Sequence, residues 1–204
     1  MGVERLLTVV EDARSQGQFV EGSVSAEEID FLQARSRGAE IRSIAEIGFN
    51  AGLSAHAFLS ANPGAHVTSF DLLAHEYSTP AKRHIDDEFP GRHTLIVGDS
   101  TRTVPEFADT AENATFDLIF IDGGHTYEVA IADLRNMKRL SRADTVIVLD
   151  DMLPHKPWGE GPIRAWQSAV ADGTVVQKGL FQDGVEVDEV GPDARRGWVV
   201  GHYV

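Results

Sequence analysis

The chain contains no cysteine, which excludes disulfide bonds, thiolate metal sites and a cysteine nucleophile. It also lacks any apolar run approaching the roughly 20 residues that a membrane-spanning helix needs. The first residues include Glu4, Arg5, Glu11 and Asp12, so the apolar stretch of a secretory signal peptide is missing. We therefore expect a cytoplasmic protein that does not insert into a membrane.

Basic residues are scarce, with 18 Lys and Arg against 32 Asp and Glu, and the formal net charge is −14. The phosphate backbone of nucleic acids and anionic membrane surfaces both attract basic patches. We therefore expect neither as a partner, and a small molecule is the more natural one. Because 204 residues can bury a sizeable core, we expect residues 1–204 to form a single domain.

The middle of the chain alternates between strand and helix patterns. Strands are expected at 41–47, 65–71, 93–98, 115–122 and 144–150, mostly as continuous apolar runs. Such runs are typical of strands that are buried on both faces of a parallel sheet. Helices are expected between them, near 52–61, 80–89, 102–110 and 126–140. This alternation predicts an α/β fold with a Rossmann-like, doubly wound and mostly parallel sheet.

The two ends of the chain add further elements. Residues 1–40 are predicted to form an N-terminal helical extension, in which Ser25-Ala-Glu-Glu28 resembles a capping box that opens a helix. After Asp151, a loop rich in proline and glycine leads to a helix at 162–171 and two late strands, 174–181 and 197–203. The expected sheet therefore has seven strands, and Asp183-Gly184 marks a turn.

The most informative run, residues 45–54, reads AEIGFNAGLS. It combines the end of a strand, a turn with Gly48 and Gly52, and the start of a helix, which is where open α/β sheets bind nucleotide-like cofactors. The glycine spacing differs from the Gly-x-Gly-x-x-Gly of dinucleotide enzymes, and Glu46 stands beside the turn. A carboxylate there disfavours a pyrophosphate and favours a cofactor with a cationic amine, such as S-adenosylmethionine. An NAD-dependent oxidoreductase remains the alternative.

Each of the first five predicted strands ends in an acidic residue: Glu46, Asp71, Asp99, Asp122 and Asp150, with Asp151 following. Parallel strands end at the same rim of a sheet, so these side chains are expected to converge on the cofactor crevice. At the end of the second strand, Asp71 could accept hydrogen bonds from both ribose hydroxyls. The alternative is that such acids only cap the helices that follow them.

Three of these acids predict a metal site. Asp122 ends one strand, and Asp150 and Asp151 end its expected neighbour, so the carboxylates should lie close together. Carboxylates so close raise one another's pKa unless a cation offsets their charge, and oxygen ligands suit Mg²⁺. We therefore predict Mg²⁺ on Asp122, Asp150 and Asp151. The alternative is that Asp150 ligates nothing and that Asp151 is solvated.

Over roughly residues 40–155, these motifs resemble the class I S-adenosylmethionine-dependent methyltransferases, and among them the metal-dependent small-molecule O-methyltransferases of the catechol and macrocin types. The most specific match is Asp122-Gly-Gly-His125-Thr-Tyr-Glu128. The resemblance implies cofactor contacts from Glu46, Gly48, Phe49, Asn50, Gly52, Ser54, Asp71, Leu72, Asp99, Ser100 and Asp122. It also implies a homodimer, since related enzymes often form one.

The resemblance assigns catalysis to His125 and Asp122. His125 follows Asp122 by three residues, where catechol-type enzymes carry a lysine general base, and histidine can serve that role near neutral pH. The expected reaction is Mg²⁺-assisted O-methylation of a small-molecule hydroxyl. Two alternatives are a metal-independent O- or N-methyltransferase that uses His125 alone and a cofactor-binding module without catalysis. His125 could also simply cap a helix.

The predicted elements divide the single domain by role. Residues 1–40 would form a helical lid or arm, residues 41–151 the cofactor-binding core, and residues 152–204 the substrate loop, a helix and the last two strands. In the loop, Trp158 is expected to wall the substrate pocket, because aromatic side chains often do so. The alternative for Trp158, and for Trp166 in the following helix, is ordinary packing.

Overall fold

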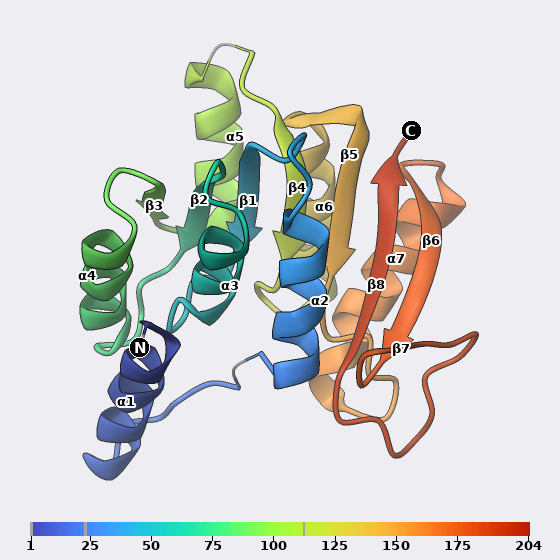
Figure 1. The fold of residues 1–204 in the computed structure, drawn as a ribbon. Helices are drawn as coiled ribbons and strands as arrows, with labels where there is room; N and C mark the ends of the chain where they lie inside the picture. The colour runs from blue at the N-terminus through green and yellow to red at the C-terminus, as the bar shows by residue number, and fades with distance from the viewer. Residues whose placement is uncertain (1, 23, 112) are drawn as a thin grey trace.

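A computed structural model of the protein describes residues 2–22, 24–111 and 113–204. In this part of the chain, eight strands form one sheet in the order β3-β2-β1-β4-β5-β8-β6-β7 (Figure 1). The neighbouring pairs among the first five strands are parallel, and β8 is antiparallel to β5 and β6. The strands are β1 (Ser43–Ile47), β2 (His66–Asp71), β3 (His93–Val97), β4 (Phe116–Ile121), β5 (Ser141–Leu149), β6 (Val175–Gln182), β7 (Val185–Glu186) and β8 (Gly197–Tyr203). The predicted doubly wound, mostly parallel sheet is confirmed.

Helices cover both faces of the sheet (Figure 1). They are α1 (Gly2–Ser15), α2 (Ala26–Ser36), α3 (Leu53–Ala61), α4 (Ser78–Glu88), α5 (Ser100–Thr110), α6 (Tyr127–Lys138) and α7 (Glu160–Ala171), with a short 3₁₀ turn, η1 (Pro157–Gly159). One apolar core packs the four helices α1, α2, α3 and α4 against one face of the sheet and includes Phe58. The second joins α5, α6 and α7 with the opposite face and includes Trp166. None of the helices in the described ranges is long and apolar enough to cross a membrane.

The sheet has one more strand than the sequence analysis expected. Asp183 and Gly184 both have positive φ angles, 47° and 88°, as the tightest hairpin turns require. The turn pairs Gln182 with Val185, and this closes a hairpin between β6 and the two-residue strand β7. A strand this short leaves no alternation pattern in the sequence, which is why only its turn could be predicted.

Helix α2 begins with the predicted capping box. The Ser25 hydroxyl accepts a hydrogen bond from the Glu28 amide at 3.2 Å, and the Ser25 amide donates to Glu28 Oε2 at 3.3 Å. Leu32 is fully buried in the core that α2 shares with α3. The box therefore sets where α2 starts, and the buried residues set which face of α2 lies against the protein.

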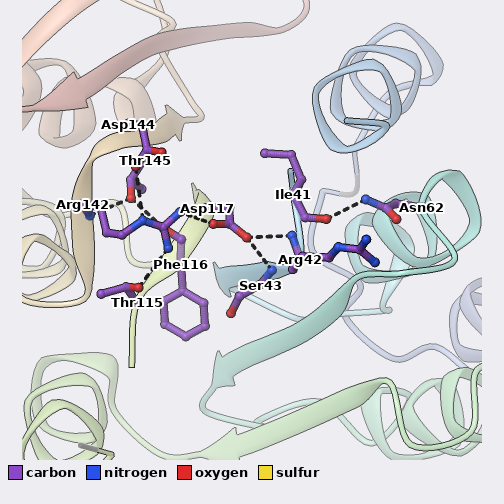
Figure 2. A network of polar contacts seen from close by, with 10 residues as sticks. All are labelled: Ile41, Arg42, Ser43, Asn62, Thr115, Phe116, Asp117, Arg142, Asp144 and Thr145. Atoms are coloured by element: carbon purple, nitrogen blue, oxygen red, sulfur yellow. Dashed lines mark hydrogen bonds and ion pairs between the residues drawn. The ribbon is translucent and has the colours of Figure 1, made fainter. Parts of the chain in front are cut away.

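At the end of the sheet opposite the candidate site, Asp117 of β4 ties three segments together (Figure 2). Its Oδ2 accepts hydrogen bonds from the backbone amides of Arg42 at 2.6 Å and Ser43 at 2.8 Å, and its Oδ1 pairs with the Arg142 guanidinium. Burial raises the pKa of Asp117, but these hydrogen bonds outweigh it and leave the pKa below its usual value. The carboxylate thus fixes the start of β1 against β4.

We expect Asp117→Ala to lower the free energy of unfolding by about 3 kcal/mol, because two backbone amides lose their acceptor and Arg142 loses its partner. Urea denaturation would measure the change. Asp144→Ala is the matched control, because Asp144 also pairs with Arg142 but its side chain is 77% exposed. Since the folded-state pKa of Asp117 is lowered, its contribution should be present above the pKa of the unfolded chain and be lost as the pH falls through the folded-state value. Equal losses in both variants would contradict this role.

Candidate active site

The glycine turn after β1 is held between its two neighbouring strands. The Gly48 amide donates to the Phe70 carbonyl of β2 at 2.9 Å, and the Asp122 amide after β4 donates to the Ile47 carbonyl at 2.9 Å. Gly48 has a φ of 98°, and a Cβ atom built on it would lie 1.9 Å from the Asp122 carbonyl oxygen. Only glycine fits this close approach. Gly52, with a φ of 73°, then caps α3.

Asp71, the acid that ends β2, holds this turn in place by accepting hydrogen bonds from its backbone. Its Oδ2 accepts hydrogen bonds from the amides of Phe49 at 2.7 Å and Asn50 at 3.0 Å, and its Oδ1 accepts one from the Leu73 amide at 2.6 Å. A carboxylate has about four acceptor positions, so Asp71 can still receive a hydroxyl group. Asp71 therefore orders the turn and remains able to accept a hydrogen bond from a ligand.

A small cavity of about 20 Å³ lies over the turn. Its lining consists of Gly22, Val24, Gly48, Phe49, Asn50, Ala51, Leu53, Ser54 and Asp122. Gly22 and Val24 belong to the connection between α1 and α2, and the Asn50 side chain donates to the Gly22 carbonyl at 3.1 Å. Neither residue could be predicted from the sequence, because nothing in the local sequence indicates that this connection folds over the turn. Beyond the cavity, Leu72 is 66% exposed.

Glu46 and the Phe49 ring support the turn from inside the protein. Glu46 is fully buried, and the Ser69 hydroxyl donates to its Oε1 at 2.6 Å. Since that hydroxyl donates to Glu46, it accepts from His93 Nε2, which lies 2.7 Å away. The Phe49 ring stacks on His93 with centroids 5.1 Å apart. Burial raises the pKa of Glu46 to about 7 and lowers that of His93 to about 3.

Two other acids and a histidine gather at the ends of β4 and β5. Asp122, His125 and Asp151 each present a ligand atom, and these atoms lie within 4.8 Å of one another. His125 Nε2 is 2.8 Å from Asp151 Oδ2, and this hydrogen bond raises the pKa of His125. Burial and the Asp150 and Asp151 carboxylates raise the pKa of Asp122 well above its usual range. This arrangement can hold a cation and can move a proton at His125.

Asp151 has a φ of 61°, in the left-handed region. Aspartate and asparagine tolerate this conformation better than most residues, because their short polar side chains can bond locally. The backbone bend lets Asp150 and Asp151 point in different directions although they are adjacent. Asp151 points to His125, and Asp150 faces a fourth acid, Glu28 of α2.

Glu28 and Arg196 belong to this neighbourhood although the sequence analysis did not select them. Glu28 is 1% exposed, and burial together with the Asp150 and Asp122 charges raises its pKa well above the usual range. Burial and the Asp151 charge raise the pKa of Asp150 to about 6. The positive charge of Arg196, just before β8, lowers the pKa of all three acids. No sequence signal links residues so far apart in the chain.

Not every strand-end acid joins the cluster. Asp99 caps α5, where its Oδ1 accepts hydrogen bonds from the Thr101 amide at 2.9 Å and the Thr101 hydroxyl at 2.7 Å. Ser100, the first residue of α5, follows it and is partly buried. The helix-capping alternative therefore describes Asp99 in this structure. Trp166 is buried in the core, which confirms the packing alternative for this residue. Trp158 is 44% exposed, and Lys156 lies over its ring.

A family model described as a methyltransferase domain matches residues 45–152. No curated protein matches the chain. Among solved structures, an O-methyltransferase from Bacillus cereus in complex with SAH is 21% identical, with 100% of this chain and 90% of that chain covered and a TM-score of 0.80. The O-methyltransferase TomG from Streptomyces achromogenes, in complex with SAM, is 20% identical, with 98% and 89% covered and a TM-score of 0.76. A putative caffeoyl-CoA O-methyltransferase from Staphylococcus aureus is 15% identical, with 98% of this chain and 92% of that chain covered and a TM-score of 0.73. These likenesses show a shared fold.

Proposed function

Because the chain belongs to the methyltransferase-domain family, we propose that it transfers a methyl group from S-adenosylmethionine to a hydroxyl oxygen of a small molecule, assisted by Mg²⁺. The observation that carries this proposal is that the Gly48 turn and the acid–histidine cluster share Asp122. The Asp122 carbonyl abuts Gly48, and its carboxylate lies with His125 and Asp151. A cofactor on the turn would thus lie next to the groups that handle the acceptor. The family match argues against an NAD-dependent oxidoreductase.

The residues of the turn suit S-adenosylmethionine. Gly48 brings bare backbone to the ligand, Asp71 can accept a ribose hydroxyl, and Leu72 offers an exposed apolar surface for the adenosine part. The 20 Å³ cavity has room for about one water molecule. We therefore infer that Gly22 and Val24 move outward when the methionyl part enters.

The acids also suit a magnesium ion. We assign it to Asp122, Asp150 and Asp151, because hard oxygen ligands are those that Mg²⁺ prefers. Asp150 Oδ1 is buried and receives no hydrogen bond from an N–H or hydroxyl donor of the described residues, and the Glu28 carboxyl group competes with an ion for the Asp150 side chain. When bound, Mg²⁺ lowers the pKa of a substrate hydroxyl.

His125 is placed to act as the general base. Its side chain is 47% exposed, so a substrate can reach it, and Asp151 holds Nε2 at 2.8 Å. In the neutral imidazole Nε2 donates its hydrogen to Asp151, so Nδ1 carries the lone pair and would take the proton of the acceptor hydroxyl. Trp158 lies in the loop after Asp151 and would wall the acceptor pocket. Much of the rate would come from holding the acceptor oxygen in line with the transferred methyl group.

Calorimetry tests this proposal without knowledge of the substrate. S-adenosylhomocysteine should bind the wild type, and Mg²⁺ titrated into that complex should bind at one site. Asp151→Ala should weaken Mg²⁺ binding about 100-fold or more, because it removes a charged ligand, whereas Asp144→Ala, which changes an exposed acid of the preceding strand β5, should not. Failure of S-adenosylhomocysteine to bind would overturn the methyltransferase assignment.

A second candidate function follows from the His125–Asp151 pair. The Asp151 carboxylate lies 2.8 Å from His125 Nε2, as in sites where a carboxylate orients a catalytic imidazole. If S-adenosylhomocysteine binds, Mg²⁺ does not, and turnover persists in excess chelator, the protein is a metal-independent O- or N-methyltransferase that uses His125 alone.

A further inference from the structure

Glu28 is an acid of the N-terminal helix that reaches the candidate active site. It occupies the first turn of α2, which Figure 1 draws at the end of the sheet where β4 and β5 terminate. Its Oε2 accepts the capping hydrogen bond from the Ser25 amide at 3.3 Å. Its Oε1 is buried and receives no hydrogen bond from an N–H or hydroxyl donor of the described residues, but the Glu28 side chain shares a hydrogen bond with the Asp150 carboxyl group. Glu28 thus caps α2 and also contacts the acid at the end of β5.

The Asp150 carboxyl group is the partner of Glu28 in this contact. Asp150 is 3% exposed, and its Oδ1 receives no hydrogen bond from an N–H or hydroxyl donor within the described ranges. Two buried carboxyl groups face each other, and Asp122 adds a third negative charge nearby. Burying several acids together is costly, so such a group needs protons or a cation to balance its charge. Arg196 supplies one positive charge, fewer than the acids present.

Glu28 stands behind Asp150 and outside the innermost group of ligand atoms. The three residues whose ligand atoms lie within 4.8 Å of one another are Asp122, His125 and Asp151. Glu28 can therefore act on a cation through Asp150, by fixing the orientation of that carboxylate and by adding charge. Outer residues that orient a metal ligand in this way typically change metal affinity by about 10- to 100-fold.

We propose that Glu28 is a positioning residue of the cation site: it holds Asp150 toward the ion and couples ion binding to the seating of α2 on the sheet. This inference rests on the proposed Mg²⁺ site. The coupling is reciprocal, because a contact that favours the bound ion must also favour the docked helix when the ion is present. The N-terminal extension is then a component of the active site and not only packing around it.

Mg²⁺ titration of the S-adenosylhomocysteine complex tests the proposal. Glu28→Gln keeps the size of the side chain and can still form the capping box, so α2 should remain folded. We expect this variant to bind Mg²⁺ about tenfold more weakly than the wild type. Asp30→Asn is the matched control, because it makes the same change of charge on an exposed position of the same helix and should bind Mg²⁺ normally.

Hydrogen exchange of the α2 amides provides the second measurement. Mg²⁺ should slow exchange across α2 in the wild type and in Asp30→Asn, and it should have no such effect in Glu28→Gln. Unchanged or tighter Mg²⁺ binding by Glu28→Gln would overturn the inference alone and leave the metal site intact. Absence of Mg²⁺ binding in the wild type would overturn the metal site and this inference together.

Discussion

Gly48→Ala should weaken the binding of S-adenosylhomocysteine at least 100-fold. The added Cβ would lie 1.9 Å from the Asp122 carbonyl oxygen, so either the turn or the end of β4 must move. Both carry groups that we assign to the cofactor, and the amides of Phe49 and Asn50 would lose their alignment with Asp71. Calorimetric titration of the variant measures the loss directly.

Gly91→Ala separates steric clash from backbone strain. Gly91, like Gly48, has a positive φ (73° against 98°), but a Cβ atom there meets nothing within 4 Å. This control should lose about 1 kcal/mol of unfolding free energy and bind the cofactor normally. Gly48→Ala should lose more stability than the control. If it bound S-adenosylhomocysteine as tightly as the wild type, the close approach of the cofactor to Gly48 would be disproved.

His125→Ala should lower kcat about 100-fold or more, which is the usual effect of removing a general base. Release of S-adenosylhomocysteine with a panel of phenols, catechols and sugars as acceptors would be followed in the presence of Mg²⁺. His66→Ala is the control, because His66 contacts Thr94 on β3 and lies outside the cluster. A variant that kept most of its activity would place the base elsewhere.

The rate of methyl transfer by the wild type should depend on pH through the protonation of His125. The hydrogen bond to Asp151 raises the pKa of His125 above 6.5, and only the neutral imidazole can accept a proton. The rate should therefore rise with pH through that raised value and then level off. The free energy of unfolding should change with pH in the opposite direction. The stability that the His125–Asp151 pair adds is fully present below the pKa of His125 in the unfolded chain, and it is lost as the pH rises through the raised pKa of the folded state. Titration of the histidine resonances by NMR would locate the pKa of His125.

Several features depended on signals that lie close together in the sequence. The apolar runs predicted the strands of the parallel sheet, and Ser25 with Glu28 predicted the start of α2. The Gly48 turn was predictable because a backbone conformation with positive φ selects glycine. Asp122 and His125 are separated by one short loop, so their proximity is also local. Periodicity, capping and turn chemistry all act within a few residues.

Other features depended on side-chain directions that only packing determines. Strand order brought Asp122 and Asp151 together, but the left-handed bend at Asp151 separated Asp151 from Asp150. At the same end of the sheet, the Asp99 side chain is directed at α5, which it caps. Neither direction can be read from the fact that an acid follows a strand.

The amino-acid sequence by itself determined the doubly wound sheet, the glycine turn and the group of acids at the strand ends, because each is written in short-range patterns. Only the tertiary structure decided that Glu28 and Arg196 stand beside Asp150 and that Gly22 and Val24 close the cavity over the turn. Glu28 lies more than a hundred residues from Asp150 in the sequence and Arg196 lies 46 residues from it, whereas Gly22 and Val24 lie in a connection without regular structure. The formation of these contacts depends on how α2 and β8 pack on the finished sheet, and no local preference encodes that packing.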